Sequence, residues 1–300
     1  MRSNLLLIAC FVLFGFTSCQ KSIEWNDLVL TPTTPVTPPP GGTTSSLLVK
    51  LVTLSNIDTL TYNYTYDSAN KLVKITTVGL SNGSKVDNLE ILVRDANERL
   101  IQYNKISYSS TSTNASGYDT TITKVHYPTN SNNFDYTVSN AFISGLYLTD
   151  STTYTYVNGK ITQLKLYYSN ALTLGQSVLA IGSNYTYDAN GNVTSLKNYD
   201  YATSTAPTLY SELAYTFDNK KSPLMLGNEA IVINADLVYI GANNGLSASY
   251  KDYSSTQSST ANISYTYSYN TNGYPTQANG TGSSSSSNIP TMLQAFYFYQ

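Results

Sequence analysis

Tyr185-Thr186-Tyr187-Asp188-Ala189-Asn190-Gly191-Asn192-Val193 is the stretch of this chain that decides its fold. Side chains alternate between the two faces of a strand, so Tyr185 and Tyr187 lie on one face. The aspartate then opens a turn, because its carboxylate accepts hydrogen bonds from amides two residues further on. Gly191 supplies the positive φ that hairpin turns require. The stretch therefore predicts a β-hairpin.

Copies of this pattern recur along the chain. Clear copies cover residues 62–72, 92–100, 185–193 and 265–274, and shortened or altered copies cover residues 154–161 and 215–221. Asn70 stands where the first copy needs a positive φ, and asparagine tolerates that conformation. Glu98 stands at the same place in the second copy, and a glutamate there predicts a different turn type.

The spacing of the copies predicts the number of hairpins. The Asp or Asn that opens each turn stands at position 67, 95, 188, 218 or 270, with Asn158 in the shortened copy. Neighbouring copies lie about 30 residues apart, whereas the gaps 95–158 and 218–270 are close to twice as long. We expect each gap to hold a degenerate hairpin, such as residues 121–127 turning into 134–138. The chain then forms an antiparallel meander of about 12–16 strands, in about six to eight hairpins.

Composition also favours strands. Tyrosine occurs 28 times against 8 Phe and 1 Trp, and only 11% of the residues are charged. Tyr and Thr prefer pleated, half-buried surfaces, and no long stretch repeats apolar residues at helical spacing. An open sheet of this many strands usually curls or closes to protect its edges. The sequence predicts an all-β fold curled into a barrel or half-barrel, with residues 295–300 as a strand that closes the edge.

The first 19 residues predict an export signal that ends in a lipid-modified cysteine. A positively charged start precedes an apolar run at 5–16, which is shorter than the roughly twenty residues that a membrane-spanning helix needs. Cys10 fits the lipoprotein-peptidase consensus better than Cys19 does, but cleavage there would leave an apolar core of only about five residues. We therefore predict Cys19 as the acylated first residue of the mature chain. The alternative is an ordinary secretory signal that leaves Cys19 as a free thiol.

Residues 20–46 predict a tether between the anchor and the body of the protein. The stretch 31–46 is rich in Pro and Thr, and proline both fixes φ and removes an amide donor, so neither a helix nor a sheet can form there. Such a stretch is an extended spacer. We expect three parts: the signal (1–19), the tether (20–46) and a β domain built of repeats (47–300).

The repeats resemble those of a known class of proteins. Residues 185–193 look like the YD repeat of Rhs-type proteins, and the layout of 47–300, including 217–224, resembles Bacteroidota lipoproteins of unknown function with a porin-like β fold. Residues 20–24 also partly match an export tag that sends many lipoproteins of that group to the cell surface. The resemblance implies fold and an outer-membrane location, on the cell surface or the periplasmic face. It carries no established activity, so no functional residues transfer.

Several chemistries lack the residues they need. A net charge near −2 gives no electrostatic case for binding nucleic acid. Cleavage before Cys19 removes Cys10, so neither a disulfide nor a thiolate metal site can form. His126 is the single histidine, which is too few for a zinc site or a catalytic triad, and we interpret it as solvent-facing or packed. We expect no cofactor.

A glycoside hydrolase needs only two carboxyl groups, so it is the enzyme that the composition still allows. Most of the aspartates that can be placed open turns. Glu90, Glu212 and Glu229 are the acids without such an explanation. We nevertheless expect a protein without enzymatic activity.

Two binding hypotheses have structural alternatives. Residues 188–192 offer alternating oxygen atoms, but a calcium loop of the EF-hand type needs a longer run that ends in a bidentate acid, so we favour the turn. Exposed tyrosines could stack on sugars, whereas tyrosines on an inner strand face would form the core with their hydroxyls at the rim. We favour the core.

Four Asp-Ser/Thr triplets exceed the number expected by chance. They begin at Asp58, Asp67, Asp119 and Asp150 and resemble Bacteroidota O-glycosylation sites. The resemblance predicts glycosylation of Thr59, Ser68, Thr120 and Ser151.

The sequence leaves three classes of function. The leading one is a lipid-anchored β protein of the outer membrane, structural or ligand-binding, with a glycan or an envelope protein as partner. The second is an integral outer-membrane barrel, for which 89–93 and 230–240 are the segments closest to lipid-facing strands. The third is a carbohydrate-active enzyme.

Overall fold

The computed structural model describes the β domain. The described ranges are 47–55, 58–81, 83–108, 117–143, 146–169, 176–202, 206–235, 237–254, 259–285 and 287–300. The predicted signal, Cys19 and the tether (20–46) lie outside the described residues.

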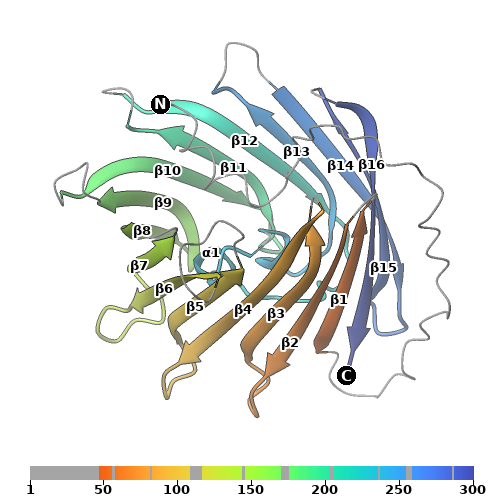
Figure 1. Cartoon of the computed structure of the whole chain (residues 1–300), viewed down its shortest axis with the longest axis horizontal. Coiled ribbons are helices and arrows are strands. Elements are labelled where there is room, and N and C mark those ends of the chain that lie inside the picture. Colours follow the sequence, from red (N-terminus) through yellow and green to blue (C-terminus); the bar gives the residue numbers. More distant parts are fainter. Residues whose placement is uncertain are drawn as a thin grey trace.

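The described residues form sixteen antiparallel strands in one closed barrel (Figure 1). The strands are β1 (Leu48–Ser55), β2 (Thr59–Tyr66), β3 (Leu72–Ser81), β4 (Ser84–Arg94), β5 (Leu100–Tyr108), β6 (Tyr118–His126), β7 (Tyr136–Ile143), β8 (Leu146–Val157), β9 (Lys160–Ser169), β10 (Val178–Tyr187), β11 (Val193–Asp200), β12 (Thr208–Phe217), β13 (Gly245–Asp252), β14 (Ser259–Tyr269), β15 (Pro275–Ser284) and β16 (Ser287–Tyr299). Each strand pairs with its neighbours in the sequence, and β1 pairs with β16. The predicted all-β meander is confirmed at the upper end of its strand count, and the barrel is closed.

Two pairings show how well the pattern located the strands. Leu51 of β1 lies opposite Tyr297 of β16, so the C-terminal run does close the barrel as predicted. Residues 121–127 and 134–138 contribute to β6 and β7, which pair from His126↔Tyr136 onward. The degenerate hairpin expected in the gap 95–158 is therefore confirmed.

The barrel has two different ends. The turns that open with Asp or Asn all lie at one end, here called the turn end, at 67–71, 95–99, 188–192, 218–244 and 270–274, together with the connections 128–135 and 158–159. The opposite connections form the loop end. We call the parts of the barrel next to these two ends the turn half and the loop half.

The turns share one hydrogen-bond pattern. In the first copy, Asp67 Oδ1 accepts bonds of 2.9 Å from the amides of Ala69 and Lys71. Asp95, Asp188 and Asn270 accept the same pair of bonds in their copies. Glu98 has a φ of +62°, as Asn70 does. The different turn type predicted from Glu98 is therefore wrong, because the fixed cap forces the left-handed conformation on whichever residue stands there.

A bulge follows most of these turns and is held by a hydroxyl. The register shifts at the start of β3, β5, β9, β11, β13 and β15, where one extra residue interrupts the ladder. Tyrosine hydroxyls donate to the carbonyl of the first strand residue at five such places: Tyr66 to Leu48, Tyr127 to Leu100, Tyr187 to Ile161, Tyr267 to Gly245 and Tyr299 to Pro275, at 2.6–3.1 Å. These bonds satisfy backbone groups that the bulge removes from the ladder.

The paired tyrosines of the repeats point into the barrel. Tyr64 and Tyr185 are only 8% and 7% exposed, and their strand neighbours on the other face are exposed. Leu48, Ile161 and Val193 are fully buried beside them. The interpretation of these tyrosines as core, with hydroxyls at the rim, is confirmed.

One turn carries a long insertion, residues 218–244, which we call the plug. Asp218 N donates to Asn244 O at 3.0 Å, just as Asp188 N donates to Asn192 O in the uninterrupted turn. Asn244 thus takes the place of the fifth turn residue. Figure 1 shows the helix α1 (Glu229–Val232) inside the ring of strands.

The plug corrects one expectation about the strands. Residues 230–240 were predicted as a lipid-facing strand segment, but they contain α1 and a 3₁₀ helix, η4 (Leu237–Tyr239). Ala230, Ile233 and Ile240 are buried in the barrel core. The apolar residues of this segment therefore fill the turn end rather than face lipid.

Candidate functional site

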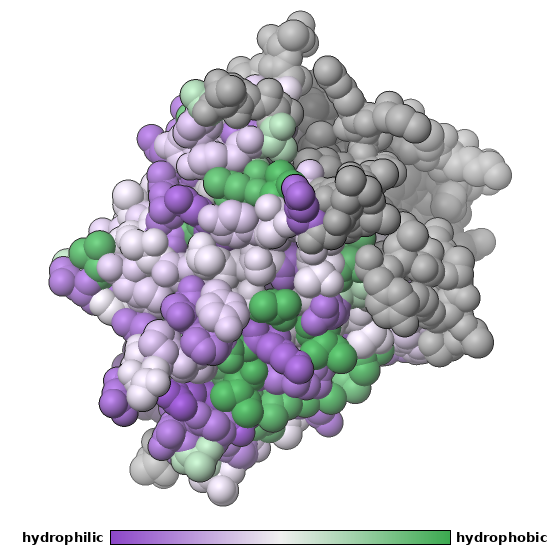
Figure 2. Space-filling view, turned by 90° about the vertical axis from the view of Figure 1, so that its left-hand side faces the viewer, coloured by the Kyte–Doolittle hydropathy of each residue, from purple (hydrophilic) through white to green (hydrophobic). Residues whose placement is uncertain are grey.

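The outer wall of the barrel is mostly polar. In β14, Asn262 and Ser264 are exposed while Ala261 and Ile263 between and beside them are buried, and β2 and β15 alternate in the same way. Figure 2 shows hydrophilic and intermediate residues over most of the side that it presents, with hydrophobic residues gathered in the lower half. The inner face is the apolar one, which is the reverse of the polarity of a membrane channel.

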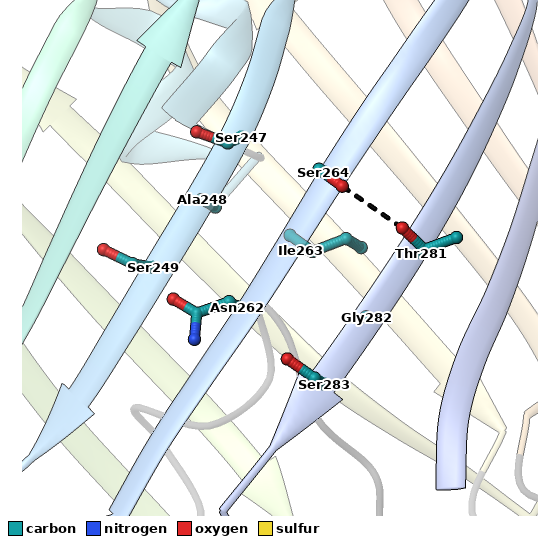
Figure 3. Close-up of a pocket in the computed structure, with 9 residues that line it drawn as sticks. All are labelled: Ser247, Ala248, Ser249, Asn262, Ile263, Ser264, Thr281, Gly282 and Ser283. Carbon is teal, nitrogen blue, oxygen red and sulfur yellow. Dashed lines mark hydrogen bonds between the residues drawn. The ribbon is translucent and has the colours of Figure 1, made fainter.

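A shallow groove of about 410 Å³ lies on the outer wall over β13, β14 and β15 (Figure 3). Its outward side chains are those of Ser247, Ser249, Asn262, Ser264, Thr281 and Ser283. The hydroxyls of Ser264 and Thr281 hydrogen-bond to each other at 3.2 Å. Short side chains on three neighbouring strands make the wall low here, so the groove is a consequence of their size.

The plug is fixed to the barrel by a buried ion pair. Arg94, the last residue of β4, donates two hydrogen bonds of 2.8 Å to the carboxylate of Glu229. The side chains of Arg94 and Glu229 are 9% and 24% exposed. Arg94 also donates to Leu72 O at 3.2 Å, which is the bulge carbonyl that a tyrosine holds elsewhere. One arginine thus serves both the repeat and the plug.

A second lock joins the plug to the turn 188–192. Asn192, which is fully buried, donates to Asn243 Oδ1 at 2.9 Å, and Asn243 N donates to Asn192 Oδ1 at 3.1 Å. A Cβ on Gly241 would lie 2.1 Å from Asn192 Oδ1 and 2.5 Å from Asn192 Cα. Only glycine fits at that place. The plug and its neighbouring turns are therefore one rigid, water-excluding end.

The inner face of the loop half is polar and only half-buried. Asp119, Asp150, Asp200 and Asp252, from four different strands, all lie on the inner face there. Burial raises the pKa of Asp150. The loop half therefore gathers carboxylates around the inner wall.

Glu90 lies deeper on the same inner face. It accepts a hydrogen bond of 2.9 Å from the hydroxyl of Tyr103 and lies opposite Lys105. Burial raises the pKa of Glu90, against the opposing effects of Lys105 and of the Tyr103 bond. This carboxyl is therefore easier to protonate than a carboxyl in water.

Charge is divided between the two faces of the wall. The lysines that face outward are Lys50, Lys74, Lys85, Lys124, Lys165, Lys197 and Lys251, and the outward acids are Asp87 and Glu212. The inner face of the loop half carries the acids described above. The outer wall is thus basic and the inner wall acidic, although the whole chain is close to neutral.

The structure separates the three acids that the sequence left unexplained. Glu90 lies inside the barrel, Glu229 is bound to Arg94 in the plug, and Glu212 faces outward, 3.6 Å from Lys197. They do not form a catalytic pair. Arg94 and the plug were not predicted as functional parts. The signal for Arg94 is its place directly before Asp95, where other copies have a tyrosine.

His126 lies exposed on the outer wall. Its Nδ1 is 2.6 Å from Asp135 Oδ1, and its ring stacks on Tyr136 with centroids 4.4 Å apart. This agrees with the interpretation of a solvent-facing histidine. Among the described residues, no three His, Cys, Asp or Glu side chains are grouped so that they could hold a metal ion.

The turn interpretation of 188–192 also agrees with the structure. The carboxylate of Asp188 accepts bonds from the amides of Asn190 and Asn192 and from the Asn192 side chain, at 2.7–2.9 Å. Its oxygen atoms are thus already used within the turn.

The four hydroxyls predicted as glycosylation sites are on the outside of the barrel. Thr59, Thr120 and Ser151 point outward from β2, β6 and β8, and Ser68 lies in an exposed turn. Their modification stays a prediction.

Comparisons with known proteins add to the fold. No protein-family model matches the chain, and no curated protein is similar to it. The described part of the chain has no helix of the length and apolar character needed to cross a membrane.

Solved structures are similar to this chain. A porin-like protein from Bacteroides uniformis matches 84% of this chain and 98% of its own, with 12% identity and a TM-score of 0.50. A porin-like protein from Bacteroides vulgatus matches 85% of this chain and 99% of its own, with 12% identity and a TM-score of 0.44. The Tc holotoxin pore of Photorhabdus luminescens matches 78% of this chain and 15% of its own, with 12% identity and a TM-score of 0.26. At this identity, the first likeness shows that the chain has a porin-like barrel fold, and it shows the fold alone.

Proposed function

We propose that this chain is a lipid-anchored, non-enzymatic protein of the outer membrane whose barrel stands in water and binds a polar ligand of the glycan class. The observation that carries the proposal is the polar outer wall. The tether and Cys19 then supply the membrane attachment that the wall does not. The plug leaves the barrel a binding or structural role rather than that of a channel.

The polarity of the wall argues against the integral-barrel alternative. A membrane barrel presents an apolar band about 25 Å tall to lipid. Here Asn262, Ser264 and Thr281 occupy outward positions in the middle of adjacent strands. Burying such groups in hydrocarbon without partners is costly. A wall of this kind favours water.

The inner face of the loop half is the surface we propose for a sugar. Tyr168 and Tyr250 face inward there, near Asp150, Asn198 and Ser211 in the strand register. An aromatic ring beside hydroxyl, amide and carboxylate groups suits a sugar, which has apolar faces and a rim of hydroxyls.

Tether cleavage tests the proposal as a whole. Protease added to membranes that carry the full chain should cut within residues 31–46 and release the folded barrel into carbonate buffer. Loss of labelled fatty acid from the Cys19→Ser variant is the matched control for the anchor. A barrel that needs detergent for release after cleavage would establish the integral alternative instead.

A glycan array separates binding from scaffold. The full chain should bind at least one glycan, and Asp150→Asn or Tyr168→Ala should weaken that binding several-fold. Asp87→Asn, on the outer wall, is the matched control and should bind as wild type does. Equal binding by all variants would remove the inner face as the site, and hydrolysis of a bound glycan that depends on Glu90 would favour the enzyme alternative.

A further inference from the structure

One side of the outer wall departs from the polar rule. Outward positions of β3–β6 carry Val78, Leu80, Leu89, Ile91, Val93 and Ile122, which we call the β3–β6 face. Val78 and Leu80 are 43% and 46% exposed, and Val93 and Ile122 are each 37% exposed. Contiguous exposed apolar side chains rimmed by polar ones mark an interaction surface.

Cations and tyrosines border the β3–β6 face. Lys74, Lys85 and Lys124 point outward from β3, β4 and β6. Asp87, the acid among them, is bound by Lys85 at 3.2 Å and by the Tyr118 hydroxyl at 2.9 Å. The ammonium group of Lys85 also lies 4.6 Å from the ring centre of Tyr108. The face is therefore apolar in its middle and positive at its border.

We infer that the β3–β6 face rests on the headgroup region of a bilayer that contains anionic lipid. Aliphatic side chains with lysines and tyrosines at their edge suit an interface, because the aliphatic groups enter the acyl boundary while the cations meet the headgroups. The wall of a closed barrel is convex, and a fluid bilayer can mould itself to a convex surface. The three lysines are complementary to anionic headgroups.

The opposite side of the barrel shows what an unattached wall looks like. The outward residues of β13–β15 are Ser, Thr, Asn, Gln and Lys, with short side chains that form the groove of Figure 3. A contact with lipid at β3–β6 would hold this polar side toward water. The inference builds on the proposed membrane location and does not need the acyl chain.

A fluorescent amino acid at position 91 or 264 of the full chain tests the contact. The probes used are phosphatidylcholine vesicles with and without phosphatidylglycerol, both carrying a lipid that quenches fluorescence. We expect quenching at position 91 to exceed that at position 264 several-fold, and to be strongest with phosphatidylglycerol. Equal quenching at the two positions, stronger quenching at 264, or none at either would overturn the inference.

Two variants connect the signal to the face. With the probe at position 122, Leu89→Ser/Ile91→Ser/Val93→Ser should reduce quenching several-fold, since serine is already common at outward positions. Lys74→Glu/Lys85→Glu should reduce it mainly on anionic vesicles. Quenching that neither variant changes would contradict the inference. An acylated chain whose position 91 stays in water would refute this contact alone, whereas contact without any acyl group would refute the proposed anchor alone.

Discussion

The two halves of the barrel solve the same problem in different ways. In the turn half, tyrosine hydroxyls hold the bulge carbonyls, the plug fills the interior, and Leu48 and Ile161 are fully buried. In the loop half, the inner face carries aspartates that are half-buried. The difference teaches that stability is concentrated at one end, which leaves the other end free for polar chemistry.

Removal of Arg94 should weaken the turn half most. Arg94→Met leaves the Glu229 carboxylate partly buried without its partner and deprives Leu72 O of its donor, so the free energy of unfolding should fall by about 2–4 kcal/mol. Chemical denaturation of the full chain measures the change. Arg94→Tyr should recover part of the loss, because a tyrosine holds the bulge carbonyl in other copies. Equal stability of the wild type and Arg94→Met would show that the plug is not locked there.

Gly241→Ala tests the second lock. The new Cβ would meet the backbone and side chain of Asn192, so we expect a loss of about 1–3 kcal/mol from overpacking. Gly227→Ala, where a Cβ meets nothing within 4 Å but φ is +58°, is the control and should cost about 1–2 kcal/mol for backbone strain alone. Thermal unfolding compares the two. A neutral Gly241→Ala variant would mean that the plug moves freely against the turn 188–192.

Tyr187→Phe removes one hydroxyl clamp and nothing else. The Tyr187 hydroxyl donates to Ile161 O at 2.6 Å, so its loss should cost about 1–2 kcal/mol. Tyr136→Phe, on the outer wall, is the matched control with an expected change near zero. Denaturant titration should separate the two variants. Identical stabilities would show that water replaces the clamp without cost.

The smallest effect expected is a difference in pH dependence between the halves. Burial raises the pKa of Glu90 in the loop half, so the folded chain binds more protons than the unfolded chain between about pH 4.3 and the raised pKa. Stability should therefore fall as pH rises through that window, and Glu90→Gln should flatten the slope.

In the turn half the sign is opposite. The hydrogen bond from Arg99 lowers the pKa of Asp95, so its contribution is present above the unfolded pKa and is lost as pH falls through the folded one. Asp95→Asn should therefore remove part of the loss at low pH. Denaturation midpoints measured from pH 3 to 7 test both signs. The same slope for both variants would contradict the division between the halves.

Local signals explain why much of the fold was predictable. An Asp or Asn followed two to four residues later by amides that it can cap, between runs of alternating residues, specifies a hairpin without any knowledge of distant contacts. That is why the strand number, the closing strand and the inward tyrosines followed from the sequence. Glu98 was misjudged because the cap at Asp95, rather than the residue at the left-handed position, sets the turn.

The plug and the charge pattern could not be predicted in the same way. The apolar run 230–240 has the composition of a strand, and only the tertiary context, an insertion held between Asp218 and Asn244, makes it fill the barrel end. The division of charge between the two wall faces depends on the register of each strand, which bulges shift by one residue. The pair of Arg94 with Glu229 joins residues 135 positions apart.

Oxidative footprinting of the full chain in its native membranes tests the orientation of the wall most directly. Met292 points outward from β16 and is 56% exposed, whereas Tyr185 points inward and is 7% exposed. Our account predicts that hydroxyl radicals oxidise Met292 in intact membranes nearly as fast as in detergent, while Tyr185 stays protected in both. Protection of Met292 in membranes that is lost on adding detergent would show that lipid covers the wall, and would contradict a barrel that stands in water.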